Sequence, residues 1–158
     1  MVDALDSNDV VDPNGNIWMD RNLGAAQVAS SSTDTDAYGN LYQWDRAADG
    51  HESRTSGSTS ATDATDAPGH TDFSTGSSDW RTTQNDNLWQ GVNGVNNPCP
   101  TGYRVPTEAE ITGLVITNTA TAFSSLLKLP LAGYRNSNNS LLANLGVFGY
   151  KILLLQEH

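Results

Sequence analysis

Basic residues are scarce in this chain of 158 residues, which carries 8 Lys and Arg side chains against 18 Asp and Glu. The formal net charge of −10 argues against a nucleic-acid-binding function, because the phosphates would be repelled. Charged residues make up only 16% of the sequence, and Ser, Thr, Asn, Asp and Gly supply most of its polarity, a composition that favours turns and loops over long helices. The acidic balance is compatible with calcium, with a cationic partner, or with a solvated acidic surface alone.

Long hydrophobic runs are also missing. The most apolar stretch near a terminus, KILLLQEH at residues 151–158, is far too short to cross a bilayer, so no membrane insertion is expected. The opening stretch VDALDSNDV has neither a basic segment nor an apolar core, so it does not have the pattern of a signal peptide. This does not assign the chain to the cytoplasm, because it can be a piece of a longer secreted protein.

The length fits a single domain over residues 1–158, with a lead-in at residues 1–9. The sequence DPNG at residues 12–15 predicts the turn of a β-hairpin, because proline presets φ and glycine accepts a positive φ. Ile17 and Met19 have the alternate spacing of a half-buried strand, so we expect the second strand of the hairpin there.

A short helix is predicted over residues 39–48, because four large side chains recur there at helical spacing: Tyr38, Leu41, Tyr42 and Trp44. Gly50 stands where a glycine would end that helix. Ser, Thr, Asp and Gly dominate residues 51–79, which are therefore expected to form a long polar loop outside the core, mobile and sensitive to proteases.

The clearest helix start in the sequence is PTEAE. Thr107 as N-cap and Glu110 three residues later form a capping box. The expected buried stripe of this helix consists of Ile111, Leu114 and Val115. Residues 126–135 are predicted as a strand that Pro130 confines to an edge or a bulge, and residues 141–155 as one or two closing strands.

The four tryptophans divide into two groups by their surroundings. Trp18, Trp44 and Trp89 stand beside apolar residues at strand or helix spacing and are expected in the core. Trp80 follows the polar loop and is the tryptophan most expected to be exposed. With His70 and Asp72 of that loop, it is the candidate for ligand binding.

Metal-ligating residue types occur in two places. His51, Glu52, His70 and Asp72 lack the spacing of a helical zinc motif and are better explained as solvated loop residues. The oxygen-rich cluster of Asn85, Asp86 and Asn87 could contribute to a calcium site. The alternative is that these side chains cap turns.

Four segments occur in a fixed order along the chain: IWMDRNLGA, YGNLYQWDRAADG, NDNLWQGVNGVNNPCPTGYRVPTEAE and LKLPLAGYR. Together, over about residues 10–150, they resemble the Fibrobacter succinogenes major paralogous domain, found in many surface and secreted proteins of Bacteroidetes-like bacteria. That family is similar to the formylglycine-generating, sulfatase-modifying domain, and both are related to the C-type-lectin-like fold. The resemblance implies an α+β fold with a twisted, mostly antiparallel sheet, long irregular loops and two short helices at GNLYQW and TEAEI.

This resemblance implies a non-catalytic, extracellular or cell-surface module of a larger protein, which binds or displays a glycan or a protein. The alternatives are a structural spacer without a ligand of its own and a degenerate relative of formylglycine-generating enzymes. Those enzymes bind copper through a pair of cysteines, and Cys99 alone cannot supply two thiolates, so no enzymatic activity is expected. Arg21, Arg104 and Arg135 each lie in a matched motif and are expected to fix loops through acidic or carbonyl partners.

The last eight residues depart from the resemblance. Similar chains continue with a stretch like GYYWSS and a second cysteine in a stretch like SVRC, whereas residues 151–158 contain neither. The expectation is therefore a truncated or frame-shifted end that leaves Cys99 as a free thiol. Residues 151–155 would replace the missing strand, in a monomer able to associate through an open sheet edge.

Overall fold

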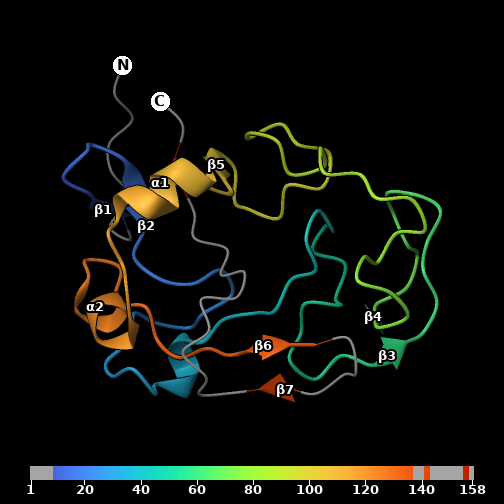
Figure 1. Cartoon of the computed structure of the whole chain (residues 1–158), viewed down its shortest axis with the longest axis horizontal. Coiled ribbons are helices and arrows are strands. Elements are labelled where there is room, and N and C mark those ends of the chain that lie inside the picture. Colours follow the sequence, from blue (N-terminus) through green and yellow to red (C-terminus); the bar gives the residue numbers. More distant parts are fainter. Residues whose placement is uncertain (1–8, 137–140, 143–154, 157–158) are drawn as a thin grey trace.

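The computed structural model describes residues 9–136, 141–142 and 155–156. In these residues the chain is a small mixed domain of short strands and two six-residue α-helices, joined by long irregular segments. Figure 1 shows α1, α2 and the β1–β2 hairpin at one end of the molecule and the β3–β4 pair at the other. At this coarse level the predicted mixture of short strands and two short helices is confirmed. None of the helices in the described residues is long and apolar enough to cross a membrane.

The largest sheet has the strand order β1-β2-β8-β5, with each neighbouring pair antiparallel. Its strands are β1 (Asp9–Val11), β2 (Ile17–Met19), β5 (Tyr103–Arg104) and β8 (Leu155–Gln156). The predicted hairpin is confirmed: Val10 pairs with Trp18, and Gly15 in the turn has a φ of 89°. The strand β8, from the C-terminal part of the chain, therefore lies between the N-terminal hairpin and β5 and pairs with both.

Asp12 holds the hairpin turn together. Its Oδ1 accepts hydrogen bonds from the backbone N–H groups of Asn14 and Asn16, at 2.8 and 3.0 Å. Its Oδ2 accepts from the Asn16 amide and from the indole N–H of Trp18, at 2.8 and 2.9 Å. Burial alone would raise the pKa of this carboxyl, but the hydrogen bonds outweigh burial and lower it. One aspartate thus satisfies both the turn and the one polar atom of a fully buried indole.

The helix α1 (Glu108–Gly113) begins as predicted, with Thr107 as N-cap and both halves of the capping box formed by Glu110. The predicted buried stripe is wrong, because Ile111 and Val115 are 40% and 74% exposed. The helix ends at Gly113, and Val115 has a left-handed φ of 52°, which breaks the helical spacing. Only Leu114 of that stripe packs against the core.

The helix α2 (Thr119–Ser124) was not predicted. Asn118 is its N-cap and forms a second capping box with Thr121. Ala122 of α2 joins Trp18, Leu127 and Leu129 in the first core cluster. Partly buried side chains pack around this cluster: Val10, Leu114 and Ile116.

The strand predicted over residues 126–135 is wrong for most of its length. Only β6 (Tyr134–Arg135) is a strand, paired antiparallel with β7 (Leu141–Leu142). Leu127 and Leu129 are buried at alternate positions, but Lys128 between them has a positive φ of 43°, so the segment is irregular.

The helix predicted over residues 39–48 is wrong. The only helical turn near it in the described chain is the 3₁₀ helix η1 (Thr35–Ala37). Gly39 and Asp45 have φ values of 67° and 62°, which no right-handed helix allows. The segment is irregular instead, with a turn at residues 44–45, and the Leu41 N–H donates to the Glu52 carbonyl (2.8 Å). Its aromatic residues contact other parts of the chain instead: Tyr42 packs against His51 and Trp89, and Tyr38 lies under the Arg54 guanidinium.

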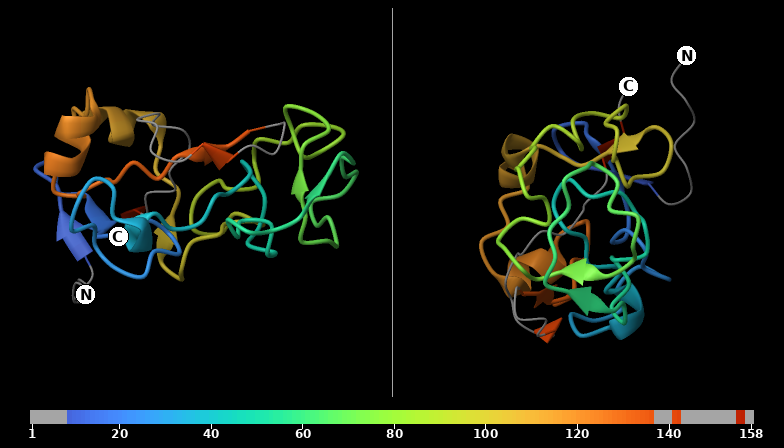
Figure 2. Two further views of the ribbon diagram at one scale, coloured as in Figure 1. Left: turned by 90° about the horizontal axis from the view of Figure 1, so that it is seen from below. Right: turned by 90° about the vertical axis from the view of Figure 1, so that its right-hand side faces the viewer.

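Residues 51–79 fold back on themselves in a pair of parallel two-residue strands, β3 (Ser58–Thr59) and β4 (Phe73–Ser74). Figure 2 shows this pair among irregular segments at one end of the molecule. The expectation that the whole stretch lies outside the core is wrong, because His51, Phe73 and Ser74 are buried. A side chain at Gly76 would collide with the Ser60 carbonyl, so this turn is closely packed. The expected protease sensitivity stays a prediction.

Trp89 is the centre of the second core cluster, which includes Cys99. The other side chains around Trp89 are Met19, Leu23, Tyr42, Tyr103 and Val105. Cys99 is a free thiol, as predicted, and burial raises its pKa to about 12. Cys99 therefore packs within an aromatic and aliphatic cluster, in which its thiol acts as a small apolar side chain.

The unusual C-terminal stretch, residues 151–158, lies outside the described residues except for β8. Leu155 pairs with Trp18 on one side and Arg104 on the other. The predicted replacement strand was placed at residues 151–155, and the described strand begins at the last of these. The truncation hypothesis itself stays a prediction.

Candidate binding site

A pocket of about 460 Å³ opens beside β4 and β6. Three separate stretches of the chain form its walls: residues 42–44, residues 73–86 and the β6 strand end. The lining residues are Tyr42, Gln43, Trp44, Phe73, Ser74, Ser77, Ser78, Asp79, Trp80, Gln84, Asp86, Arg135 and Asn136. Aromatic rings, carboxylates, hydroxyls and amides therefore share one cavity, which is the usual make-up of a site for a polar organic ligand.

Trp44 is the exposed aromatic residue of the pocket, with 49% of its surface accessible. Its ring lies 5.1 Å from the ring of Trp89, centroid to centroid, at an interplanar angle of 59°. The prediction that Trp44 is a core residue is wrong, whereas Trp18 and Trp89 are buried as predicted. A half-exposed indole that packs against a buried one offers a ligand an apolar surface that is already in position.

Trp80 lines the same pocket but is only 2% exposed, so the prediction that it is the exposed tryptophan is wrong. Its indole N–H donates to the Trp44 carbonyl (2.7 Å). The guanidinium groups of Arg46 and Arg81 lie 5.7 and 5.8 Å from the centre of its ring. Trp80 is thus held by its neighbours and fixes the backbone from which Trp44 projects.

Gln43 connects the two main walls of the pocket. Its side-chain amide accepts from the Ser74 N–H and donates to the Ser74 carbonyl, both at 2.9 Å. The Gln43 side chain thus bonds to both backbone groups of Ser74, as a neighbouring strand would. Ser74 is 4% exposed, and its hydroxyl has no hydrogen-bond partner in the described part of the chain. An unpartnered hydroxyl in a pocket wall is costly unless water or a ligand completes its bonds.

Two carboxylates lie on the pocket wall beside Trp44. Asp79 accepts from the Arg81 N–H (2.8 Å), and Asp86 accepts from the neutral Gln84 amide (2.8 and 3.0 Å). Behind them, burial raises the pKa of Asp45, the hydrogen bond from the Trp89 N–H lowers it, and the charges of Asp86 and Asp79 raise it further. The pocket lining thus carries two carboxylates, Asp79 and Asp86, and one guanidinium, Arg135.

The predicted calcium ligands form a local turn. Asn85 Oδ1 accepts from the backbone and side-chain N–H groups of Asn87, at 3.3 and 3.4 Å. Asp86 and Asn87 are exposed, and of the three residues only Asp86 lines the pocket. The turn-capping alternative describes what these side chains do, and calcium binding stays a prediction.

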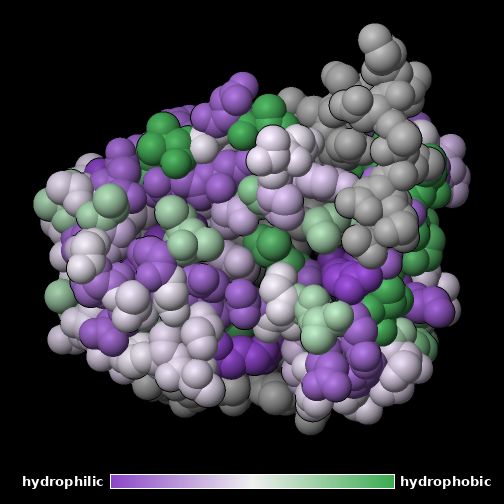
Figure 3. All heavy atoms as spheres, turned by 180° about the vertical axis from the view of Figure 1, so that it is seen from behind, coloured by the Kyte–Doolittle hydropathy of each residue, from purple (hydrophilic) through white to green (hydrophobic). Residues whose placement is uncertain are grey.

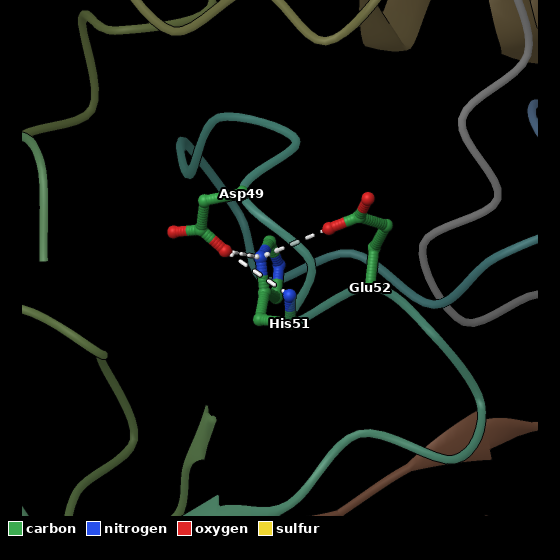
Figure 4. Close-up of side chains that lie close together, drawn as sticks. All are labelled: Asp49, His51 and Glu52. Carbon is green, nitrogen blue, oxygen red and sulfur yellow. Dashed lines mark hydrogen bonds and ion pairs between the residues drawn. The ribbon is translucent and has the colours of Figure 1, made fainter. Parts of the chain in front are cut away.

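In the described residues, one close group of three metal-ligating side chains does exist: Asp49, His51 and Glu52. Figure 4 shows the two carboxylates on either side of the His51 ring. His51 Nδ1 lies 2.8 Å from Asp49 Oδ1 and 3.4 Å from Glu52 Oε2. His51 Nε2 accepts from the Gln43 N–H (3.0 Å), so the proton of the neutral ring lies on Nδ1 and is donated to Asp49.

The remaining oxygens of this group also have donors. Asp49 Oδ2 accepts from Arg46 Nε, and Glu52 Oε2 accepts from the Gly50 N–H, both at 2.8 Å. Burial lowers the pKa of His51 to about 4, and the Arg46 charge contributes in the same direction. A metal would have to displace a ring proton that is already well bonded. The group works instead as a clamp that fixes the Gln43 backbone, and through it the pocket wall.

His70 and Asp72, the other residues predicted to bind a ligand, do not line this pocket. His70 Nδ1 accepts from the Asp72 N–H, and His70 Nε2 lies 3.1 Å from Asp63 Oδ2. The Asp72 and His70 carbonyls both accept from the Arg46 guanidinium. The structure gives these two residues contacts within the fold, and their proposed part in ligand binding stays a prediction.

The three arginines predicted to fix loops have the expected kinds of partner. Arg21 pairs with Asp20 (2.7 Å), and Arg104 makes two bonds to the Glu110 carboxylate (3.0 and 2.8 Å). Arg135 donates to carbonyls and a hydroxyl of residues 56–57 and lies 4.6 Å from the centre of the Phe73 ring.

No family model matches the chain, and no curated protein or solved structure matches it.

Proposed function

We propose that the chain is a non-catalytic carbohydrate-binding module whose site is the pocket beside Trp44. The observation that carries the proposal is the half-exposed Trp44 ring within a 460 Å³ pocket that also contains carboxylate, hydroxyl and amide groups. A sugar ring has an apolar C–H face and a rim of hydroxyls, so it needs both an aromatic surface and hydrogen-bonding groups within one cavity.

The resemblance to the Fibrobacter succinogenes major paralogous domain supports the same proposal. It implies a lectin-like module, extracellular or on the cell surface, within a larger protein. The polar surface agrees with such a setting: on the face shown in Figure 3, hydrophobic side chains lie in small groups among polar ones. A module of this kind needs no reacting group. The lone cysteine is partly buried, and burial raises its pKa to about 12, which disfavours the thiolate that copper or covalent chemistry needs.

The proposal is tested by titrating glycans, first on an array and then by calorimetry, against the parent chain and a Trp44→Ala variant. We expect saturable binding to at least one glycan and a loss of about tenfold or more in affinity in the variant, because the stacking surface is removed. Trp44→Phe should keep part of the affinity. Val95→Ala is a suitable control, since Val95 is 79% exposed and does not line the pocket.

Trp80→Ala is not an informative test of binding, because removing a 2% exposed tryptophan from a packed site is expected to unfold the region. If no glycan binds, or if Trp44→Ala binds as well as the parent, the module is a spacer or recognises a protein through another surface.

A further inference from the structure

The charge around the Trp44 pocket indicates which sugars it accepts. Resting on the proposed function, we propose that the pocket selects sugars that carry protonated amino groups, such as unacetylated hexosamine units, over neutral and acidic sugars.

The first observation is that the two pocket carboxylates have no cationic partner. Asp79 and Asp86 form no ion pair in the described part of the chain, and the hydrogen bonds that they accept there come from a backbone N–H and a neutral amide. Asp79 Oδ2 accepts no hydrogen bond from the described residues. Both carboxylates therefore keep the capacity to bind a cation from outside.

The second observation is that the arginines near the pocket are engaged elsewhere. The Arg135 guanidinium bonds to the Ser56 hydroxyl and to two carbonyls and lies over Phe73. Arg46 pairs with Asp49, and Arg81 with Asp66. The Arg46 and Arg81 charges are therefore paired with carboxylates outside the pocket lining. Arg135 itself lines the pocket, so two carboxylates and one guanidinium face it and the charge of its lining is net negative.

Asp45, which does not line the pocket, is affected by the same two carboxylates. It is 2% exposed, and its Oδ2 has no partner in the described residues. The charges of Asp79 and Asp86 reach this group strongly enough to raise its pKa, in addition to the effect of burial. With a net charge of −10 for the whole chain, a uronic acid or sialic acid would be repelled.

The third observation concerns the surface that the ligand would contact. The exposed Trp44 ring can accept both the C–H face of a sugar and the ammonium group beside it, since cations are attracted to an indole face. The exposed hydroxyls of Ser77 and Ser78, which also line the pocket, can bond to sugar hydroxyls. Acidic, aromatic and hydroxyl groups together suit a protonated amino sugar better than a simple metal ion or a neutral sugar.

The test compares two oligosaccharides of equal length by calorimetry: a hexamer of glucosamine and the same hexamer fully N-acetylated, at a pH at which the amines are protonated. We expect the parent chain to bind the amine form at least about tenfold more tightly. The double variant Asp79→Asn and Asp86→Asn should lose this preference, measured as the ratio of the two affinities. Glu108→Gln, which removes one exposed charge on α1, should change neither affinity.

Equal or tighter binding of the acetylated hexamer would overturn the charge selection and leave the proposed function standing. A preference that survives in the double variant would also overturn it. If neither hexamer nor any other glycan depends on Trp44, the proposed function itself fails. A hexamer of lysine serves as the last comparison: binding as tight as that of the amino sugar, and unchanged in Trp44→Ala, would show a general cation surface instead of an amino-sugar site.

Discussion

Replacing Glu110 by glutamine is expected to destabilise the protein in a pH-dependent way. The Glu110 carboxylate accepts two bonds from Arg104 and two from Thr107, all at 2.7 to 3.0 Å. The bonds from Arg104, and then those from Thr107, outweigh burial and lower the pKa of Glu110 from 4.5 to about 2. The carboxylate thus joins the end of β5 to the start of α1.

The magnitude follows from the pKa. A tenfold change in proton affinity is worth about 1.4 kcal/mol, so the whole displacement corresponds to at most about 3 kcal/mol. The Arg104 and Glu110 side chains are 15% and 21% exposed, and solvent screening and the ordering of two long side chains reduce this to about 1–2 kcal/mol. Glu110→Gln should lower the free energy of unfolding by this amount at pH 7.

The pH dependence has a definite sign. Because the pKa of Glu110 is lower in the folded than in the unfolded chain, its contribution is fully present above pH 4.5 and is lost as the pH falls towards about 2. Urea unfolding of the parent and the variant at pH 7, 5, 4 and 3 should therefore give a stability difference that shrinks below pH 5. Taking this difference removes the effects of all other titrating groups.

Glu108→Gln is the matched control, because Glu108 lies in the same first helical turn but is exposed. It should cost no more than a few tenths of a kcal/mol, the value of one charge near a helix start. An Arg104→Gln variant combined with Glu110→Gln should show a coupling of about 1 kcal/mol. A loss that is the same at pH 3 and pH 7, or no larger than that of Glu108→Gln, would refute the ion-pair reasoning.

Two further predictions concern buried titratable groups. Cys99 should react slowly with a thiol reagent in the folded protein, because it packs against Trp89 and its pKa is raised to about 12. In about 8 M urea, which unfolds most domains, the reaction should be complete. A fast reaction in buffer would place Cys99 outside that cluster. His51 should stay neutral, with its proton on Nδ1, down to a pH of about 4, whereas a histidine of the unfolded chain is protonated below 6.5. The free energy of unfolding should therefore decrease as the pH falls from 6.5 to about 4. The ¹⁵N chemical shifts of the ring would show an error in either the tautomer or the pKa.

The parts of the fold that could be predicted from the sequence are those that depend on close neighbours in the chain. The hairpin turn is fixed by Asp12, Asn14 and Gly15, and the start of α1 is fixed by Thr107 and Glu110. Within each of these two groups the residues lie within four positions of one another. The start of α2 belongs to the same class. Its signal, Asn118 followed three residues later by Thr121, was present in the sequence, but Thr in place of Glu or Gln made it weaker.

The exposure of the tryptophans could not be predicted, because it depends on distant partners. Trp80 is buried by its hydrogen bond to the Trp44 backbone, 36 positions away, and by Arg46 and Arg81 at its ring. Trp44 is half exposed although its ring lies 5.1 Å from that of the buried Trp89. The local pattern of polar and apolar residues indicates neither the burial of Trp80 nor the exposure of Trp44. It also does not indicate the left-handed conformation of Asp45, which excludes a helix there.

The pocket depends on a buried polar network more than on secondary structure. Arg46 is fully buried, and its guanidinium donates to Asp49, Gln43, Asp72 and His70.

Burying an arginine is costly unless each donor finds a partner, and removing one partner of a buried charge costs several kcal/mol, about 3–5. The network must therefore form almost completely or not at all. Its members are the same segments that carry the pocket: Gln43 precedes Trp44, and Asp72 precedes Phe73 and Ser74. In a chain with so few charged residues and so little regular structure, this requirement positions Trp44 and Ser74 before a ligand arrives. A site held in this way loses little conformational entropy on binding, so a pocket with one exposed indole can still discriminate between ligands.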